Sequence, residues 1–332
     1  MTTTKSMASV DVKKTGTFER PKMIEVMVFQ DKVINFVGMF PFMTGVSVFL
    51  TIASIVLIFT KGLNFGVDFK GGAEVQVKFA QRVETALLRD AFVKSNITVS
   101  SIQTIGDDSS NEFLIKIPVV EGKDINLAST GVIKELKASF PDKGIDIRKT
   151  EIVGPKAGEQ LRTSGFWAML WSILGIMVYV GLRFDMKYAP GAVVSLLHDA
   201  IIVLGLFVIT GKEFNLQILG AILALIGYSV NDTVVIYDRI REHEKSSQQA
   251  PIVDLINKGL TETIARTILT AGTTFSVCLI MFLFGGGVIH DFFFALWAGI
   301  IVGTYSSVFV ASPLVLVLYR LVTKRKWDKH KA

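Results

Sequence analysis

The sequence predicts an all-α membrane bundle of six transmembrane helices, with one extracytoplasmic α+β domain in the first loop. Three observations support this class. Half of the 332 residues are hydrophobic and only 19% are charged, which is unlike the composition of a soluble enzyme. Six apolar runs are long enough to cross a bilayer, which takes about 20 residues of helix. By contrast, the stretch 61–160 carries 14 basic and 14 acidic residues and is typical of a soluble domain.

The chain can be divided in order by its apolar runs. A mixed segment, 1–35, precedes the first run, which ends without a small-x-small cleavage site and is therefore expected to stay as an anchor. The α+β domain is expected at 61–160, a cytoplasmic loop at 239–262 and a basic tail at 320–332. The transmembrane spans are expected at 36–60, 161–182, 188–210, 215–238, 263–284 and 292–319.

Lys and Arg in the short loops predict how the bundle is oriented, because cytoplasmic loops carry an excess of them. Basic residues flank the second and fourth connections and fill the tail, whereas the third connection has only Lys212 and the fifth has none. The even-numbered loops and both termini are therefore expected to be cytoplasmic. The segment 61–160 is then expected on the outer side of the membrane.

The segment 61–160 consists of two similar halves. Alternating apolar residues predict strands and helical spacing predicts helices. The expected elements are a strand at 75–79, a helix at 83–94, strands at 97–105 and 112–118, a helix at 125–140 and a strand at 145–153. A ferredoxin-like βαββαβ domain is the simplest arrangement of these elements.

Several classes of function are excluded by what the sequence lacks. No basic face with interleaved aromatic residues occurs in the neutral middle segment, so nucleic acid is not an expected partner. The single cysteine, Cys278, excludes an intramolecular disulfide and a cysteine zinc cluster. Neither a G-x-S-x-G nor an H-E-x-x-H motif is present. We therefore expect no catalytic residue and no metal, and a lipid bilayer as the surroundings.

The candidate functional residues are the ionisable side chains inside the apolar spans. They are His198, Asp199, Asp232 and Arg266. Each costs about 2.5–3.5 kcal/mol on insertion scales and must face protein or water. Asp232 and Arg266 lie on consecutive antiparallel spans at nearly the same depth, so the spacing makes a charge pair feasible.

Two interpretations of these residues remain open. Asp232 and Arg266 could only hold two helices together, or they could form a proton relay with the hydroxyl group of Thr270, one turn beyond Arg266. Because adjacent residues point about 100° apart on a helix, His198 and Asp199 fit capping or interhelical hydrogen bonding more simply than a relay.

Small residues recur at every fourth position of the last span. They are Ala295, Gly299, Gly303, Ser307 and Ala311. Such a stripe permits close contact between helices, so it is expected to serve packing, with a sliding surface during transport as the second interpretation.

Several strings in this sequence resemble those of the SecD/SecF family of protein translocase subunits, within the resistance-nodulation-division superfamily, and most closely its SecF branch. The opening motif of that family, G-x-D-F-x-G-G, is matched by Gly66, Asp68, Phe69, Gly71 and Gly72. The fourth span and its exit match the family at Gly227, Tyr228, Ser229, Asn231, Thr233, Asp238 and Arg239. Further matches are Leu197-His198-Asp199, Arg266-Thr267-Ile268-Leu269-Thr270 and Gly303-Thr304-Tyr305-Ser306-Ser307.

The resemblance implies a subunit that works with SecD and uses the proton-motive force to assist polypeptide export across the bacterial inner membrane. In the family the matching Asp, Arg and Thr act in proton movement, which assigns that role here to Asp232, Arg266 and Thr270. The implied partners are SecD, the SecYEG channel, YajC, YidC and the unfolded polypeptide in transit. No cofactor other than the proton gradient is implied. Members carry two six-helix halves, of which this chain would supply one.

Two other functions stay open beside this one. A structural scaffold that only clamps other translocase helices needs no titrating carboxylate. An intramembrane aspartyl protease needs two carboxylates that share one proton, for which Asp199 and Asp232 could be nominated. Neither residue lies in a G-x-G-D string, which disfavours the protease.

Overall fold

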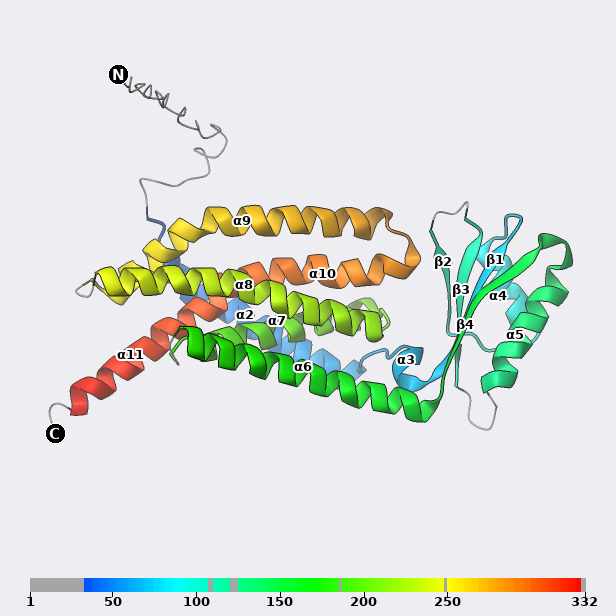
Figure 1. Ribbon diagram of the computed structural model, residues 1–332, viewed down its shortest axis with the longest axis horizontal. Helices are drawn as coiled ribbons and strands as arrows, with labels where there is room; N and C mark the ends of the chain where they lie inside the picture. The colour runs from blue at the N-terminus through cyan, green and yellow to red at the C-terminus, as the bar shows by residue number, and fades with distance from the viewer. Residues whose placement is uncertain (1–32, 107–109, 120–124, 185–186, 248–249, 330–332) are drawn as a thin grey trace, which may run out of the picture.

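The computed structural model of the protein describes residues 33–106, 110–119, 125–184, 187–247 and 250–329. Figure 1 shows an elongated molecule with a helical bundle at one end and a small α/β domain at the other. The chain enters and leaves this domain at the same end of the bundle, between the first and second long helices. Most of the predicted N-terminal segment 1–35 lies outside the described residues.

Six stretches of helix are long and apolar enough to cross a membrane, with mean hydropathies of 1.7 to 2.4, which confirms the predicted fold class. The first five are α2 (Phe36–Lys61), α6 (Pro155–Arg183), α7 (Ala189–Thr210), α8 (Leu216–Ser246) and α9 (Ile252–Phe284). The sixth consists of α10 (Gly287–Ser306), the π-helical turn η2 (Ser307–Ala311) and α11 (Ser312–Lys329).

The helices extend beyond the predicted spans. α8 continues to Ser246 and α9 begins at Ile252, so most of the predicted loop 239–262 is helical. α6 begins at Pro155, inside the range expected for the α+β domain, with the proline in its first turn, where its missing N–H costs nothing. Hydropathy marks the part of a helix in lipid, whereas charged residues such as Glu and Arg continue the helix into water.

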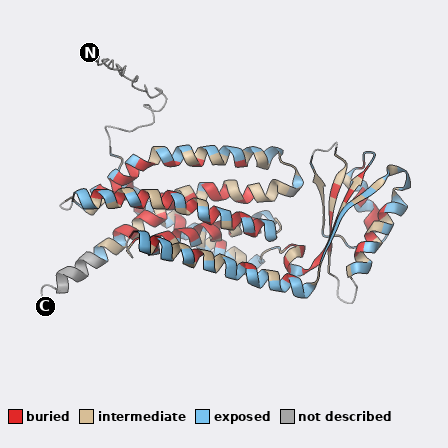
Figure 2. Ribbon diagram, viewed as in Figure 1, coloured by how far each residue is buried: buried red, intermediate tan, exposed pale blue. Residues whose placement is uncertain are grey.

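The bundle has a packed centre and a loose periphery. Within the apolar windows of α7, α8 and the sixth span, half or more of the residues are buried, against 11–17% for α2, α6 and α9. Figure 2 shows the same contrast between the inner and outer helices. The peripheral helices therefore offer most of their surface to lipid or to another protein.

The α/β domain has the βαββαβ order that the sequence predicts. Its elements are β1 (Gly72–Phe79), α4 (Thr85–Lys94), β2 (Ser101–Ile105), β3 (Glu112–Pro118), α5 (Ile125–Ser139), the short helix η1 (Pro141–Lys143) and β4 (Ile145–Val153). The strands form one antiparallel sheet in the order β2-β3-β1-β4. β2 is shorter than the predicted strand at 97–105.

The two faces of this sheet have different partners. Val75 and Val77 on β1 alternate inward and pack with Leu88 of α4 and Leu136 of α5, all with no exposed surface. Each such side chain contributes about 1.5–3 kcal/mol by leaving water. The opposite face, with Lys116 of β3, is polar and is turned to the bundle, where Lys116 contacts the connection between α7 and α8.

The glycine-rich motif builds the joint between the bundle and the domain. Phe69, in the short helix α3 (Val67–Lys70), stacks on Phe214 with ring centroids 5.5 Å apart. The carboxylate of Asp68 accepts a hydrogen bond of 2.9 Å from the backbone N–H of Leu216, at the start of α8. Gly72 has a φ of 159°, and a Cβ there would lie 2.6 Å from the carbonyl oxygen of Ile117. Only glycine fits this crossing.

Candidate functional site: a buried polar centre

Asp199 is the centre of a polar cluster inside the bundle. It lies on α7 with no exposed surface. Its carboxylate accepts hydrogen bonds from the hydroxyl groups of Ser229 on α8, at 2.7 Å, and Ser306 on α10, at 2.9 Å. Nδ1 of His198 lies 3.0 Å from its other oxygen. Asp199 therefore forms interhelical hydrogen bonds, the simpler of the two interpretations of this pair. The contact between His198 and Asp199 lies within α7.

A second hydroxyl pair extends the cluster one turn along α8. The hydroxyl groups of Thr233 and Ser307 lie 2.8 Å apart, and both residues are fully buried. Ser307 begins the π-helical turn η2, a feature that is frequent at functional sites. The hydroxyl of Ser312, beyond the turn, donates to the carbonyl of Ser307 at 3.1 Å. The polar centre thus joins α7, α8 and the sixth span.

The small-residue stripe of the last span brings these helices into contact. A Cβ added to Gly303 would lie 3.1 Å from Cβ of Ser229, and one added to Gly299 would lie 2.4 Å from Leu225, also on α8. Ala295 and Ala311 are buried at the two ends of the stripe. The stripe therefore sets the distance at which Ser229 and Ser306 reach Asp199.

Asp232 lies beside this cluster and is not bonded to it. It is 4% exposed on α8, and among the residues that the structure describes it has no hydrogen-bond or ion-pair partner. The guanidinium group of Arg266 is the charge that acts on it. A carboxylate this isolated in a membrane helix has a high energetic cost and indicates a function.

Arg266 and Thr270 lie on the peripheral helix α9. Arg266 is exposed and Thr270 half-buried, and the Thr270 hydroxyl donates to the backbone carbonyl of Arg266 at 3.0 Å. No ion pair joins Arg266 to Asp232 within the described part of the chain. The matched depth that the sequence indicates therefore does not bring the two charges into direct contact.

Arg266 lines a polar pocket in the bundle. It has a volume of about 420 Å³ and is lined by residues of α6, α8 and α9. These parts of the three helices lie toward the end of the bundle away from the α/β domain (Figure 1). Asp238 and Arg239 of α8 line it together with Arg183. Arg239 forms ion pairs with Glu242, at 2.6 Å, and with Glu262.

The outer face of α8 is a feature that the sequence analysis missed. Gly220, Ala224, Gly227 and Asn231 are all exposed, although they belong to an apolar span. A Cβ on Gly220 or Gly227 would meet nothing within 4 Å. Tyr228 points elsewhere and packs near Cys278. The signal was present as small residues three and four positions apart, a spacing that lets another helix approach closely.

No group of three or more His, Cys, Asp or Glu side chains that could hold a metal ion is found among the described residues.

Comparison with known proteins places this arrangement in a family. Residues 132–321 match the family described as protein export membrane protein SecD/SecF, C-terminal, and residues 56–81 match the SecD/SecF GG motif. The second match contains the joint from Gly66 to Gly72.

Individual relatives cover nearly the whole chain. The protein translocase subunit SecF of Desulfurispirillum indicum is 40% identical over 86% of this chain and 92% of the relative. SecF of Escherichia coli O157:H7 is 36% identical over 82% of this chain and 84% of its own.

A solved structure shares the architecture. The crystal structure of SecDF, a translocon-associated membrane protein from Thermus thermophilus, matches with a TM-score of 0.73 and 32% identity over 87% of this chain. The match spans only 39% of that SecDF chain. The chain therefore belongs to the SecD/SecF family of protein export membrane proteins, in which the relatives it resembles over nearly their full length are the SecF subunits.

Proposed function

We propose that the chain is the SecF subunit of a bacterial Sec export machine, and that with SecD it uses the proton-motive force to assist translocation of unfolded polypeptide through the SecYEG channel. The observation that carries the proposal is Asp232, a buried and unpaired carboxylate in the membrane part of a family member. YajC and YidC are further proposed partners. The role is that of an accessory subunit and not of an enzyme.

Asp232 is the proposed proton-binding group. Its isolation means that loading a proton removes a buried charge, and that releasing the proton restores the attraction of Arg266. The pocket of about 420 Å³ that Arg266 lines supplies a water path from one end of the bundle. Thr270 is proposed to position Arg266 through the backbone of α9.

The polar centre around Asp199 is proposed as the element that responds. Ser229 and Thr233 on α8 flank Asp232 and bond Asp199 and Ser307 on the other two helices. A change of charge at Asp232 therefore acts on the helix that carries half of this network. Moving one charge through 100 mV releases about 2.3 kcal/mol, enough for roughly a fiftyfold shift between two arrangements.

The second half of the proposed proton path comes from SecD. Exposed Asn231 and exposed Arg266 are polar groups on the membrane-spanning surface, where lipid is a poor solvent for them. A six-helix partner packed on α8 and α9 would cover both. The orientation that we propose for the chain in the membrane has the α/β domain in the periplasm and both termini in the cytoplasm.

The experiment that tests the proposal removes the titrating proton while keeping the shape of the side chain. Asp232→Asn should insert normally and fail to support proton-driven export, whereas Asp232→Glu should retain part of it. Asp254→Asn, which changes an exposed carboxylate at the start of α9, is the matched control and should export normally. Full export by Asp232→Asn under an intact proton gradient would defeat the relay and favour the scaffold.

A further inference from the structure

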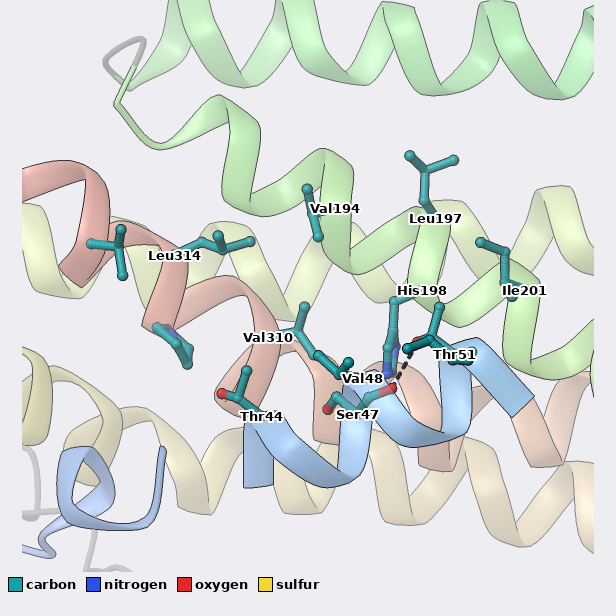
Figure 3. Close-up of a pocket in the computed structure, with 13 residues that line it drawn as sticks. Thr44, Ser47, Val48, Thr51, Val194, Leu197, His198, Ile201, Val310 and Leu314 are labelled. Carbon is teal, nitrogen blue, oxygen red and sulfur yellow. Dashed lines mark hydrogen bonds between the residues drawn. The ribbon is translucent and has the colours of Figure 1, made fainter. Parts of the chain in front are cut away.

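The flank of the bundle between α2, α7 and the last span contains a pocket that plays no part in the proton path described above (Figure 3). Its volume is about 430 Å³, and side chains of all three elements line it. Val48 and Ile52 of α2 and Val194 and Leu197 of α7 form much of its wall and are 42–57% exposed. Because these residues lie in membrane-spanning helices, the pocket opens toward lipid.

The polar groups in the pocket wall are turned into the protein. The hydroxyl groups of Thr44, Ser47 and Thr51 donate hydrogen bonds of 2.8–3.3 Å to acceptors within the chain. The ring of His198 also lines the pocket, but its Nε2 is buried. The surface that the pocket offers to an occupant is therefore apolar. It fits hydrocarbon, whereas a polar group placed there would lose its hydrogen bonds to water.

The size of the pocket distinguishes a hydrocarbon chain from a helix. Between the lining residues Thr44 and Ile52, α2 rises about 12 Å at 1.5 Å per residue. A helix about 10–12 Å wide needs roughly 900 Å³ or more over that length, about twice the volume of the pocket. A single acyl chain is narrower and more flexible than a helix. The pocket therefore fits one lipid chain better than a transmembrane helix of a partner.

Basic side chains lie at the end of the pocket near the start of α7. Arg320 of α11 follows the lining residue Val317 by three positions, which is about 4.5 Å along the helix axis. It is exposed and forms no ion pair within the described part of the chain. The ammonium group of Lys187, just before α7, lies 5.5 Å from the centre of the Tyr319 ring on α11. Lys187 is paired with Glu244 at 2.6 Å, so Arg320 is the cation that an anion can reach.

We infer that this pocket binds one acyl chain of an anionic phospholipid, whose phosphate group binds the guanidinium group of Arg320. Lipid tails are as apolar as the pocket wall, so hydrocarbon alone gives little preference for the site. Arg320 supplies the preference, because a guanidinium group binds a phosphate through paired N–H donors. The bound chain lies against Val194 and His198 of α7, the helix that carries Asp199. The lipid thus supports the polar centre from the membrane side.

The test uses the full-length chain, purified with its membrane partner and returned to nanodiscs of zwitterionic lipid. Two photoprobes carry the same diazirine on the acyl chain, one with a phosphatidylglycerol headgroup and one with a phosphatidylcholine headgroup. Labelled peptides from α2, α7 and α11 are identified by mass spectrometry. We expect saturable labelling at these helices. It should be roughly fivefold stronger with phosphatidylglycerol at equal concentration, the ratio expected for one basic residue that attracts an anionic lipid.

One pair of variants tests the contact with the headgroup. Arg320→Gln should remove the preference for phosphatidylglycerol and leave labelling by phosphatidylcholine unchanged. Its matched control is Lys258→Gln, which changes an exposed lysine on α9, a helix that does not line the pocket. This control should preserve the preference of the wild type.

A second set of variants tests the seat of the acyl chain. Val194→Trp on α7 and Val48→Trp on α2 each fill the pocket from one side and should reduce labelling by both probes. Val178→Trp on α6, which is 56% exposed and outside the pocket, is the control and should change nothing. Gel filtration with the partner checks that each variant is folded, and two independent tryptophans keep the test decisive if one of them disturbs the bundle.

The inference is overturned by equal labelling of the wild type with the two probes, or by a preference that survives in Arg320→Gln. Labelling that a folded tryptophan variant does not reduce also overturns it, as do exclusion of both probes and crosslinks from pocket residues to a partner helix. None of these readouts depends on export, so they are independent of the proposed role of Asp232.

Discussion

The ammonium group of Lys116 on β3 lies 2.9 Å from the carboxylate of Glu213, in the connection between α7 and α8. Glu74 on β1 is a second partner at 3.6 Å. Burial lowers the pKa of Lys116, but the hydrogen bond and charge of Glu213 outweigh burial, so the pKa lies above its usual value. This nearly buried cation therefore fastens the α/β domain to the bundle and stays charged at neutral pH.

The first prediction concerns this fastening. Lys116→Met and Glu213→Gln should each loosen the domain, seen as faster hydrogen exchange in α3 and β3. In a double-mutant cycle the effects of the two changes should be coupled by about 1–3 kcal/mol. Each variant alone already removes the hydrogen bond between the two charged groups, so the double variant cannot lose it a second time. Additive effects would show that the domain is held by the Phe69–Phe214 stack and the backbone contacts alone.

The second prediction is a pH dependence of the same joint. Burial raises the pKa of Glu74 above its ordinary value of 4.5, against the opposing charge of Lys116. A raised folded-state pKa means that Glu74 contributes stability fully below its ordinary pKa, and that this contribution is lost as the pH rises through the raised value. The apparent Tm should therefore fall across this window.

Glu74→Gln removes that titration. It should raise the apparent Tm at neutral pH relative to wild type and flatten the profile in the window above 4.5, with the two proteins converging at lower pH. Asp90→Asn, at an exposed position of α4, should leave the profile unchanged. A Glu74→Gln variant that is less stable than wild type at neutral pH would mean that attraction to Lys116 outweighs burial.

The third prediction compares two glycines of the α/β domain. Gly72→Ala should destabilise the protein by more than about 1 kcal/mol, because its φ of 159° and the 2.6 Å approach to Ile117 exclude a Cβ. Gly131→Ala, in helix α5 with nothing within 4 Å, should instead stabilise it by roughly 0.4–1 kcal/mol. Thermal unfolding followed by gel filtration checks both, and equal shifts would contradict the role of the joint.

The sequence predicts the spans and the domain well because each depends on a local pattern. A lipid-crossing helix requires an uninterrupted apolar run, and the period-two pattern of β1 requires one buried sheet face. The sequence analysis missed the helix ends at Ser246 and Ile252. Hydropathy marks the apolar residues that lie in lipid, but it does not show where the hydrogen-bonded helix continues into water.

The candidate site was only partly predictable. Depth along a helix can be predicted by counting residues, and the charge of Arg266 does act on Asp232. Rotation about the helix axis does not follow from counting, and in the structure Arg266 is exposed, lines the pocket between α6, α8 and α9, and forms no ion pair with Asp232 among the described residues. The bonds from Ser229 and Ser306 to Asp199 depend on how three helices pack around Gly303, which one sequence does not specify.

The fourth prediction tests the orientation in the membrane. On a Cys278→Ala background, which keeps the buried apolar cluster of that cysteine intact, Ser110→Cys in the α/β domain should react with an impermeant maleimide added to intact spheroplasts. Ser247→Cys, at the C-terminal end of α8 and on the expected cytoplasmic side, should react only after the membrane is opened. The reverse pattern would place the Arg266 pocket on the outer side and invert the proposed proton path.

The fifth prediction concerns the exposed face of α8. A helix of the SecD half is expected to pack against Gly220, Ala224, Gly227 and Asn231, because their small side chains permit close approach and Asn231 needs a polar partner in the membrane. Asn231→Cys should crosslink to a cysteine in the partner when the membranes are oxidised. Ile52→Cys on α2, equally lipid-facing at 57% exposure, should not.

A bulky side chain on this face distinguishes packing from a chance encounter. Gly227→Leu adds volume where the chain itself has none nearby, so the isolated subunit should fold and insert as before. Copurification of the partner should fall. Proton-driven export should fall with it, because the partner surface that completes the proton path beside Asp232, further along α8, would be lost. Normal copurification of Gly227→Leu would show that the partner packs elsewhere, and α9 with its exposed Arg266 would then be the next face to test.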